Sequence, residues 1–276
     1  MTIKSHTGIV AVVATALALS LSVTYAGAQA AGDGQSGVAT SLKAILASPH
    51  RSPQNRARDR DRHPLETLLW FGIKPDMTVV EISPGAGWYT EILAPFLKPH
   101  GKLYDAVGSG EPARRFRQRL AADPALYGKV IVTELVPPEK TRIAPAGTAD
   151  MVLTFRNVHN WINGGYAEDV FKAMYQALKP GGMLGLVEHR ANPALPQDPK
   201  AGSGYVREDY VIKLANAAGF QLVGRSEINA NPRDTKDYPG GVWTLPPTLR
   251  LKERDREKYL AIGESDRMTL KFVKPR

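Results

Sequence analysis

Cysteine is absent from all 276 residues of the chain. The protein therefore forms no disulfide, and it cannot carry the lipid-modified cysteine of a bacterial lipoprotein. A chain without cysteine is compatible with an oxidising compartment but does not require one. The sequence also has no internal repeat, and its only low-complexity stretch is rich in Gly, Ala and Ser, at residues 31–37. The length then suits one large domain with short appendages.

Acidic residues are fewer than basic ones, 27 against 36, which gives a formal net charge of +9. A basic protein can bind an anionic partner, but the charge does not choose among a nucleotide, a nucleic acid and a membrane surface. Hydrophobic residues make up 43% of the chain and charged residues 23%, which is an ordinary globular composition. The chain can therefore bury a sizeable core.

Residues 1–30 have the pattern of a secretory signal peptide. Lys4 gives a weakly positive start, residues 8–23 are small and apolar, and Ala28-Gln29-Ala30 matches a signal-peptidase site. The apolar stretch is short for a membrane-spanning helix, which needs about 20 residues. We expect cleavage after Ala30, export to the periplasm and no stable membrane insertion of the mature chain. An uncleaved membrane anchor is the alternative.

Residues 31–63 are predicted to form a flexible leader and an N-terminal lid segment, with a short helix at residues 41–47. The second half of this region is crowded with arginines: Arg51, Arg56, Arg58, Arg60 and Arg62. Two interpretations stay open. Either the alternating charges form a solvated helix face, or the arginines cover the anionic part of a ligand.

Strands and helices alternate through residues 64–276, which we predict to form one domain. Apolar and β-branched stretches predict seven strands, at residues 79–82, 101–108, 129–135, 149–155, 183–187, 220–228 and 268–273. Helices are expected at residues 65–71, 89–96, 112–122, 166–178, 207–218 and 250–259. The segment Lys179-Pro180-Gly181-Gly182 is expected to end the fourth of these helices. This alternation predicts an α/β fold with a mostly parallel sheet and helices on both faces.

The first strand of this domain leads into a glycine-bearing turn. The sequence Glu81-Ile82-Ser83-Pro84-Gly85-Ala86-Gly87 follows two buried valines, and apolar residues at helical spacing come after it. A strand, a glycine turn and a helix in this order let backbone amides approach a bound ligand closely. Ligands of such sheets bind beyond the carboxyl ends of the strands, so the loops after strands one, two, four and five should share a site.

The order of elements, this turn and Leu178-Lys179-Pro180-Gly181-Gly182 resemble class I S-adenosylmethionine-dependent methyltransferases. More narrowly, the segment Phe155–Trp161 is similar to a bacterial, often exported group known only as predicted methyltransferases. The resemblance covers residues 64–273. It implies a Rossmann-like sheet of seven strands whose C-terminal strand is antiparallel, S-adenosyl-L-methionine as cofactor, and methyl transfer. We expect a small-molecule acceptor, and the oligomeric state stays open.

The resemblance also implies which residues hold the cofactor. In the acidic-apolar-Gly-x-Gly-x-Gly pattern, Glu81 takes the acidic position, Ser83 stands for the first glycine, and Gly85 and Gly87 are the second and third. An acid after strand two should bind the ribose hydroxyls, because a carboxylate accepts two hydrogen bonds from a diol. Asp105 is the first candidate for this role. The alternatives are Glu111, or a purely structural Asp105. Asn157, after strand four, completes the cofactor set.

Two histidines are the candidate catalytic residues. His159 follows strand four and His189 ends strand five, and these strands are neighbours in the implied sheet. Imidazole can remove a proton from an acceptor hydroxyl or amine near neutral pH. A structural, hydrogen-bonded role is the alternative for each. Metal binding by both histidines and Glu188 is conceivable, but no HxxxH or HExxH spacing supports it, so no metal is predicted.

Three other functions are compatible with an α/β sheet of this kind. A nucleotide-dependent oxidoreductase needs a glycine where Thr90 stands, and the Tyr175–Lys179 match to short-chain dehydrogenases falls at a helix end. A nucleic-acid methyltransferase lacks its tetrapeptide after strand four, where Arg156–His159 stands instead. The remaining rival is an exported, non-catalytic or differently liganded protein that retains the fold, because the cofactor is made in the cytoplasm.

Overall fold

The computed structural model describes residues 1–2 and 35–276. The predictions for the signal peptide and its cleavage site fall almost wholly outside the described residues. Residues 35–47 are helical, so this helix begins earlier than predicted and takes in part of the expected leader. In the described part of the chain, no helix has both the length and the apolar character needed to cross a membrane.

Seven strands form one sheet in the order β3-β2-β1-β4-β5-β7-β6. The pairs within β3-β2-β1-β4-β5 are parallel, and β7 is antiparallel to both of its neighbours. The predicted α/β class, with a mostly parallel sheet and an antiparallel last strand, is therefore confirmed. The strands are β1 (Thr78–Ile82), β2 (Lys102–Val107), β3 (Ile131–Glu134), β4 (Ala149–Phe155), β5 (Leu178–His189), β6 (Gln221–Ser226) and β7 (Arg267–Val273).

Five of the six helices predicted for residues 64–276 are found close to their expected bounds, whereas four short helices, α2, α3, α7 and α8, were not predicted. Pro64 opens α4, where a missing N–H costs no helical bond, and Gly72 ends it in the left-handed conformation. The helices are α2 (Pro53–Arg56), α3 (Asp59–Arg62), α4 (Pro64–Phe71), α5 (Thr90–Leu97), α6 (Gly110–Ala122), α7 (Pro124–Tyr127), α8 (Val158–Gly164), α9 (Ala167–Ala177), α10 (Glu208–Ala217), α11 (Arg256–Ile262) and a 3₁₀ turn, η1 (Gly241–Thr244).

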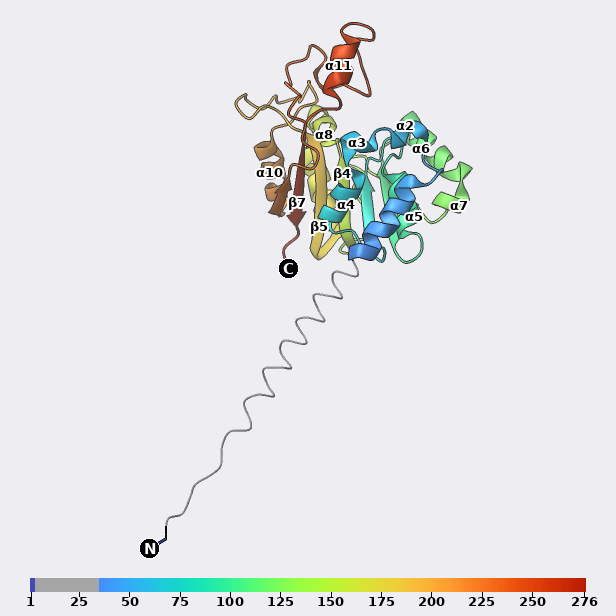
Figure 1. Ribbon diagram of the computed structural model, residues 1–276, viewed down its shortest axis with the longest axis vertical. Helices are drawn as coiled ribbons and strands as arrows, with labels where there is room; N and C mark the ends of the chain where they lie inside the picture. The colour runs from blue at the N-terminus through green and yellow to red at the C-terminus, as the bar shows by residue number, and fades with distance from the viewer. Residues whose placement is uncertain (3–34) are drawn as a thin grey trace.

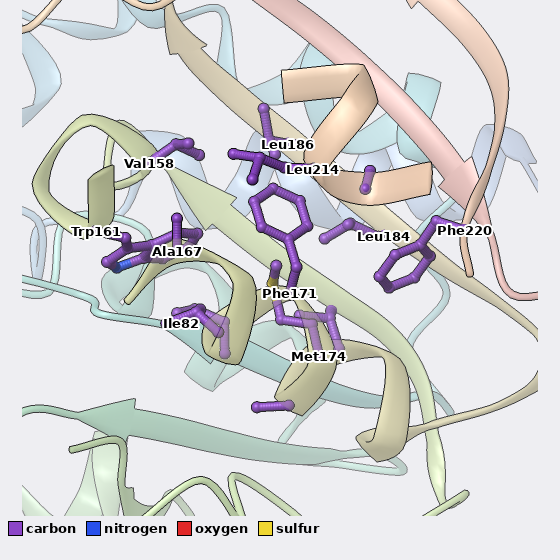
Figure 2. Close-up of a cluster of buried hydrophobic side chains, with 14 of the residues drawn as sticks. Ile82, Val158, Trp161, Ala167, Phe171, Met174, Leu184, Leu186, Leu214 and Phe220 are labelled. Atoms are coloured by element: carbon purple, nitrogen blue, oxygen red, sulfur yellow. The ribbon is translucent and has the colours of Figure 1, made fainter. Parts of the chain in front are cut away.

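Both faces of the sheet are covered by apolar helix faces. Successive strand residues point to opposite faces, so Val80 packs in the core beneath α8, α9 and α10, whereas Val79 packs in the core beneath α4, α5 and α6. Figure 2 shows the first core, where the Phe171 ring of α9 lies close to Leu214 of α10 and Leu184 of β5. The two cores hold the sheet rigid and leave only its strand ends free to build a site.

Two local predictions are corrected by partners that lie far away in sequence. The segment Lys179–Gly182 follows the end of α9 as predicted, but it is a bulged part of β5 rather than a separate turn. Gly181 is left-handed (φ 79°), its N–H donates to the Lys274 carbonyl (2.8 Å), and the N–H of Lys274 donates to the Gly182 carbonyl (2.9 Å). The helix expected at residues 250–259 begins only at Arg256, because left-handed residues interrupt the path before it: Leu249, Lys252 and Asp255.

The carboxyl ends of the parallel strands all lie at one edge of the sheet. In Figure 1 this edge is at the top, where α2, α3 and α8 lie and where the segment containing α11 projects above the sheet. The predicted convergence of the loops after β1, β2, β4 and β5 is therefore found at this edge.

Candidate functional site

The turn after β1 lies at the topological switch point of the sheet. β1 has β2 on one side and β4 on the other, so the strand order reverses there. Ligands of open α/β sheets bind in the crevice outside the strand ends at such a point. The glycine turn and the tips of β4 and β5 are therefore the first place to look for a site.

Left-handed backbone recurs at every second residue of the turn, at Ser83 (φ 50°), Gly85 (φ 61°) and Gly87 (φ 80°). These are the three glycine positions of the motif, and the serine adopts the conformation that glycine would take. This conformation costs a non-glycine residue about 1–2 kcal/mol. The Asn157 side chain donates from Nδ2 to the carbonyls of Ile82 (3.0 Å) and Ser83 (3.3 Å), which fixes the strained turn to the tip of β4.

Gly87→Ala is expected to destabilise the protein by about 1–2 kcal/mol. Alanine is strained at φ 80°, and its Cβ would lie 3.2 Å from the Phe116 ring. Gly108→Ala is the matched control, because Gly108 is outside the left-handed region and a Cβ there meets nothing within 4 Å. Urea denaturation followed by circular dichroism measures both variants. An equal loss of stability in the two would contradict the conformational requirement at Gly87.

A cavity of about 480 Å³ lies beside the turn, and it is lined by Gly85, Ala86, Glu111, Pro112, Phe116 and Arg119. A Cβ on Gly85 would meet nothing within 4 Å, so free space adjoins the backbone there. Glu111 stands in the first turn of α6 and is exposed. Hydrogen bonds from Arg114 and Arg115 hold the pKa of its carboxyl below the ordinary value, so Glu111 is ionised beside the turn.

The other two predicted acids lie together inside the fold. Glu81 and Asp105 are register partners on β1 and β2, and both are buried. The Glu81 carboxyl accepts a hydrogen bond from the Thr90 hydroxyl (2.8 Å), while neither carboxyl oxygen of Asp105 has a partner within the described chain. Burial raises the pKa of Glu81 to about 8, and burial together with Glu81 raises the pKa of Asp105 well above its usual value. Asp105 therefore offers no exposed oxygen to a ribose.

The two predicted catalytic histidines lie side by side, with ring centroids 5.4 Å apart. His159 is buried at the start of α8, and its Nδ1 lies 3.1 Å from Oε1 of Glu188, which is fully buried at the end of β5. Glu188 also accepts a hydrogen bond from the backbone N–H of His159 (3.2 Å). The carboxylate thus fixes the imidazole through Nδ1 and leaves Nε2 available for other partners.

His189 has different surroundings. Its Nδ1 lies 2.5 Å from the Ser265 hydroxyl oxygen, on the segment before β7. Burial, followed by the proximity of His159 and Arg267, holds the pKa of His189 well below its ordinary value. His189 is therefore neutral at neutral pH, and a general-base role suits the carboxylate-bound His159 better.

Above the histidines lies a second cavity, of about 240 Å³, whose polar lining is mostly guanidinium: Arg58, Arg62, Arg156 and Arg267, with Glu264 as the acid. The solvated-face interpretation of the arginine-rich segment is therefore wrong for Arg62, which is buried, whereas Arg60 remains exposed. Sequence reasoning did not assign Arg156, Arg267 or Glu264. The position of Arg156 directly after a predicted strand could have marked it as a site residue. In the structure it follows β4 and adopts a left-handed φ of 61°.

His159, Glu188 and His189 also form the one group of three potential metal ligands among residues 1–2 and 35–276, with ligand atoms within 4.8 Å of one another. The Glu188 oxygens already accept hydrogen bonds from His159 and from the His189 backbone (2.7 Å). The nearby guanidinium groups of Arg156 and Arg267 create a positive field that opposes a divalent cation. The prediction of no metal is therefore kept.

No protein-family model and no curated protein matches the sequence. The structure is similar to a SAM-dependent methyltransferase from Aquifex aeolicus, with a TM-score of 0.54, 17% identity, and coverage of 86% of this chain and 98% of the other. It is also similar to the [4+2]-cyclase SpnF (TM-score 0.56, 13% identity, 78% and 81% covered). The glycopeptide N-methyltransferase MtfA gives a TM-score of 0.50 at 16% identity, with 81% and 100% covered. The chain therefore has the class I methyltransferase fold.

Proposed function

We propose that the protein transfers a methyl group from S-adenosyl-L-methionine to a small-molecule acceptor. The observation that carries the proposal is the turn at the switch point, in which Ser83, Gly85 and Gly87 are all left-handed and Gly85 faces free space. A turn of this shape lets backbone reach a ligand that side chains would keep away.

The residues around the turn fit this cofactor. Glu111 provides an ionised carboxylate at the cavity beside Gly85, and it can accept hydrogen bonds from a ribose diol when the exposed side chains of Arg114 and Arg115, which bond to it in the structure, turn away. Phe116 and Pro112 give the same cavity an apolar wall suited to a base. We propose Glu111 in the ribose role first given to Asp105, because Asp105 is enclosed. Glu81, Ser83, Gly87 and Asn157 would shape the turn rather than touch the ribose.

When bound, the cofactor supplies a methyl group already activated by its sulfonium. The protein then has to align the acceptor and manage one proton. His159, held through Nδ1 by the buried Glu188, can take the proton of an acceptor O–H or N–H at Nε2. Arg62 of α3 and Trp243 of η1 line the cavity at this position.

Titration calorimetry of the full-length protein with S-adenosylmethionine and S-adenosylhomocysteine tests the proposal. We expect both to bind, and Glu111→Gln to weaken binding by about 10-fold or more, since a hydrogen bond to a charged group contributes about 1.5–3 kcal/mol. Glu168→Gln is the matched control, because Glu168 is an exposed acid in the first turn of α9. Asp105→Asn should leave the affinity unchanged.

The rival proposal is a protein that keeps the fold without methyl transfer. It is favoured by one finding, that a [4+2]-cyclase shares this fold. No heat with either ligand at millimolar concentration would support the rival and remove the cofactor assignment. Loss of binding in Asp105→Asn but not in Glu111→Gln would return the ribose role to Asp105.

Export remains a proposal about residues 1–30. It is supported by the signal-like pattern of Lys4, the apolar stretch and Ala28-Gln29-Ala30. Fractionation of cells that produce the protein, with N-terminal sequencing of the periplasmic fraction, is expected to show a chain that begins at Ala31. A full-length chain in the membrane fraction would favour the uncleaved anchor.

A further inference from the structure

One carboxylate, Glu264, serves three guanidinium groups above the histidines. Nε of Arg58 lies 2.6 Å from its Oε1, Nε of Arg62 lies 3.3 Å from its Oε2, and Arg267 donates to the same Oε2. Burial alone would raise the pKa of Glu264, but the guanidinium groups of Arg267 and Arg62 hold it well below its usual range. Glu264 is therefore ionised, and its two carboxyl oxygens are already bonded to three arginines.

The cavity carries more positive than negative charge. Its lining includes a fourth guanidinium, that of Arg156, which makes no ion pair within the described residues. Glu264 is the acid that lines it, and even with Glu188 beneath His159 the acids are fewer than the guanidinium groups. Burial, with Arg267 nearby, lowers the pKa of Arg156 to about 10. Buried charges in proteins are normally paired, so this cavity lacks anions.

Two buried donor atoms have no partner. Nη1 of Arg62 and Nε of Arg267 are enclosed without any hydrogen bond in the described chain, and the two side chains are 4% and 2% exposed. Guanidinium groups present planar pairs of donors that match carboxylate and phosphate oxygens. Free donors on arginines that already surround a cavity are what a bound anion would satisfy.

The opposite side of the cavity is apolar. Val242, Trp243 and two prolines line it, and the Trp243 ring lies edge-on to His159 with centroids 6.0 Å apart. The guanidinium of Arg250 covers the Trp243 ring at 4.6 Å, which holds this wall in place. The volume of about 240 Å³ is at the small end for ligand cavities.

Resting on the proposed methyl transfer, we propose that the acceptor is a small organic anion with an apolar body. Its carboxylate or phosphate binds Arg62, Arg156 and Arg267, its body packs on Trp243, and its hydroxyl or amine lies at His159. In the transfer, the acceptor oxygen or nitrogen would bond to the methyl carbon with its lone pair while Nε2 of His159 takes the O–H or N–H proton. The electron pair of the broken C–S bond would stay on sulfur, which leaves a neutral thioether.

The test uses the full-length protein without cofactor and three probes of similar shape: benzoate, phenyl phosphate and uncharged benzamide. We expect at least one anion to bind at least 10-fold more tightly than benzamide, and the tighter of the two identifies the acid. Arg62→Gln should weaken that binding at least 10-fold. Arg60→Gln, in which an 82% exposed side chain of the same helix is changed, should not.

Arg62→Gln could weaken binding by disturbing the fold, because Arg62 also links α3 to Glu264. A second variant separates this effect from the loss of an anion-binding group. Arg156→Gln removes a guanidinium that makes no ion pair in the described chain, and it should weaken the anion to a similar degree while circular dichroism stays unchanged. Equal affinity for benzoate, phenyl phosphate and benzamide, or equal losses in Arg60→Gln and Arg62→Gln, would overturn the proposal.

The carboxylate of the cofactor is the competing anion, and a pair of ligands separates it from the acceptor. S-adenosylhomocysteine has this carboxylate, and 5′-methylthioadenosine lacks it. If Arg62→Gln and Arg156→Gln weaken the binding of S-adenosylhomocysteine but not that of 5′-methylthioadenosine, the arginines hold the cofactor and the acceptor proposal fails. If neither nucleoside binds wild type but an anionic probe does, the anion site stands and methyl transfer fails.

Discussion

Replacing His159 by glutamine is expected to lower kcat for methyl transfer by about 10²–10⁴-fold, the range contributed by general base catalysis. Glutamine can still donate a hydrogen bond to Glu188, but it has no basic nitrogen to accept the acceptor's proton. The measurement is the rate of S-adenosylhomocysteine formation with a hydroxyl- or amine-bearing organic anion. The dissociation constant of S-adenosylmethionine should stay the same, because His159 lines the other cavity.

His100→Gln is the control for this experiment, since His100 is exposed between α5 and β2. Glu188→Gln should also lower kcat, because the neutral amide can hold Nδ1 of His159 but cannot stabilise the imidazolium that forms. An undiminished kcat in His159→Gln would remove proton transfer from the mechanism. Alignment of the reacting atoms would then be the whole contribution of the protein.

Asp105→Asn is expected to stabilise the protein at pH 8 by about 1.4 kcal/mol for each unit by which burial and Glu81 raise the pKa of Asp105, because the amide is neutral without taking up a proton on folding. Asp105 is fully buried, neither of its oxygens has a hydrogen-bond partner in the described chain, and its register partner is the carboxyl of Glu81. An amide removes the second acid of the pair and keeps its shape. Asp76→Asn, on the exposed turn before β1, is the matched control.

The raised pKa values also determine how the stability of the folded protein changes with pH. The pKa of Glu81 is raised to about 8, and that of Asp105 is also raised, above the ordinary value of 3.8. Between about pH 4 and pH 8 the folded protein therefore holds protons that the unfolded chain has released, so stability falls as the pH rises through this window. Urea titrations at pH 5, 6.5 and 8 should show this slope in wild type and a smaller slope in Asp105→Asn. A parallel slope in both proteins would contradict the buried acid pair.

The sheet could be predicted from the sequence because each strand is marked by the apolar pattern of its own few residues. Alternating apolar residues such as Val79 and Val80 face the two cores, and the strands that they mark appear within a few residues of their predicted ends. The turn at Gly85 and Gly87 is equally local, since its shape depends on glycine itself. Features of this kind need no knowledge of distant partners.

The acids and arginines of the site could not be placed in this way. Spacing from the glycine turn favoured Asp105, but the register of β2 against Glu81 turns that side chain into the protein and leaves Glu111 at the cavity. Arg60 and Arg62 are alike in sequence and differ in burial because Glu264, 202 residues after Arg62, pairs with only one of them. A pattern in one short segment contains no information about such a partner.

The sharing of Glu264 by three arginines has a consequence for biosynthesis. Arg58 leaves the ribosome 206 residues before the carboxylate with which it pairs, an interval of about 10–40 s at 5–20 residues per second. Until then α3 is held by the pair of Asp59 with Arg51 but lacks its ion pairs to Glu264, and the cavity above His159 lacks the part of its lining that follows η1. The strands β1 to β5 can already be paired during this time. The nascent chain therefore acquires most of its sheet well before it completes the cavity that is proposed to hold an acceptor.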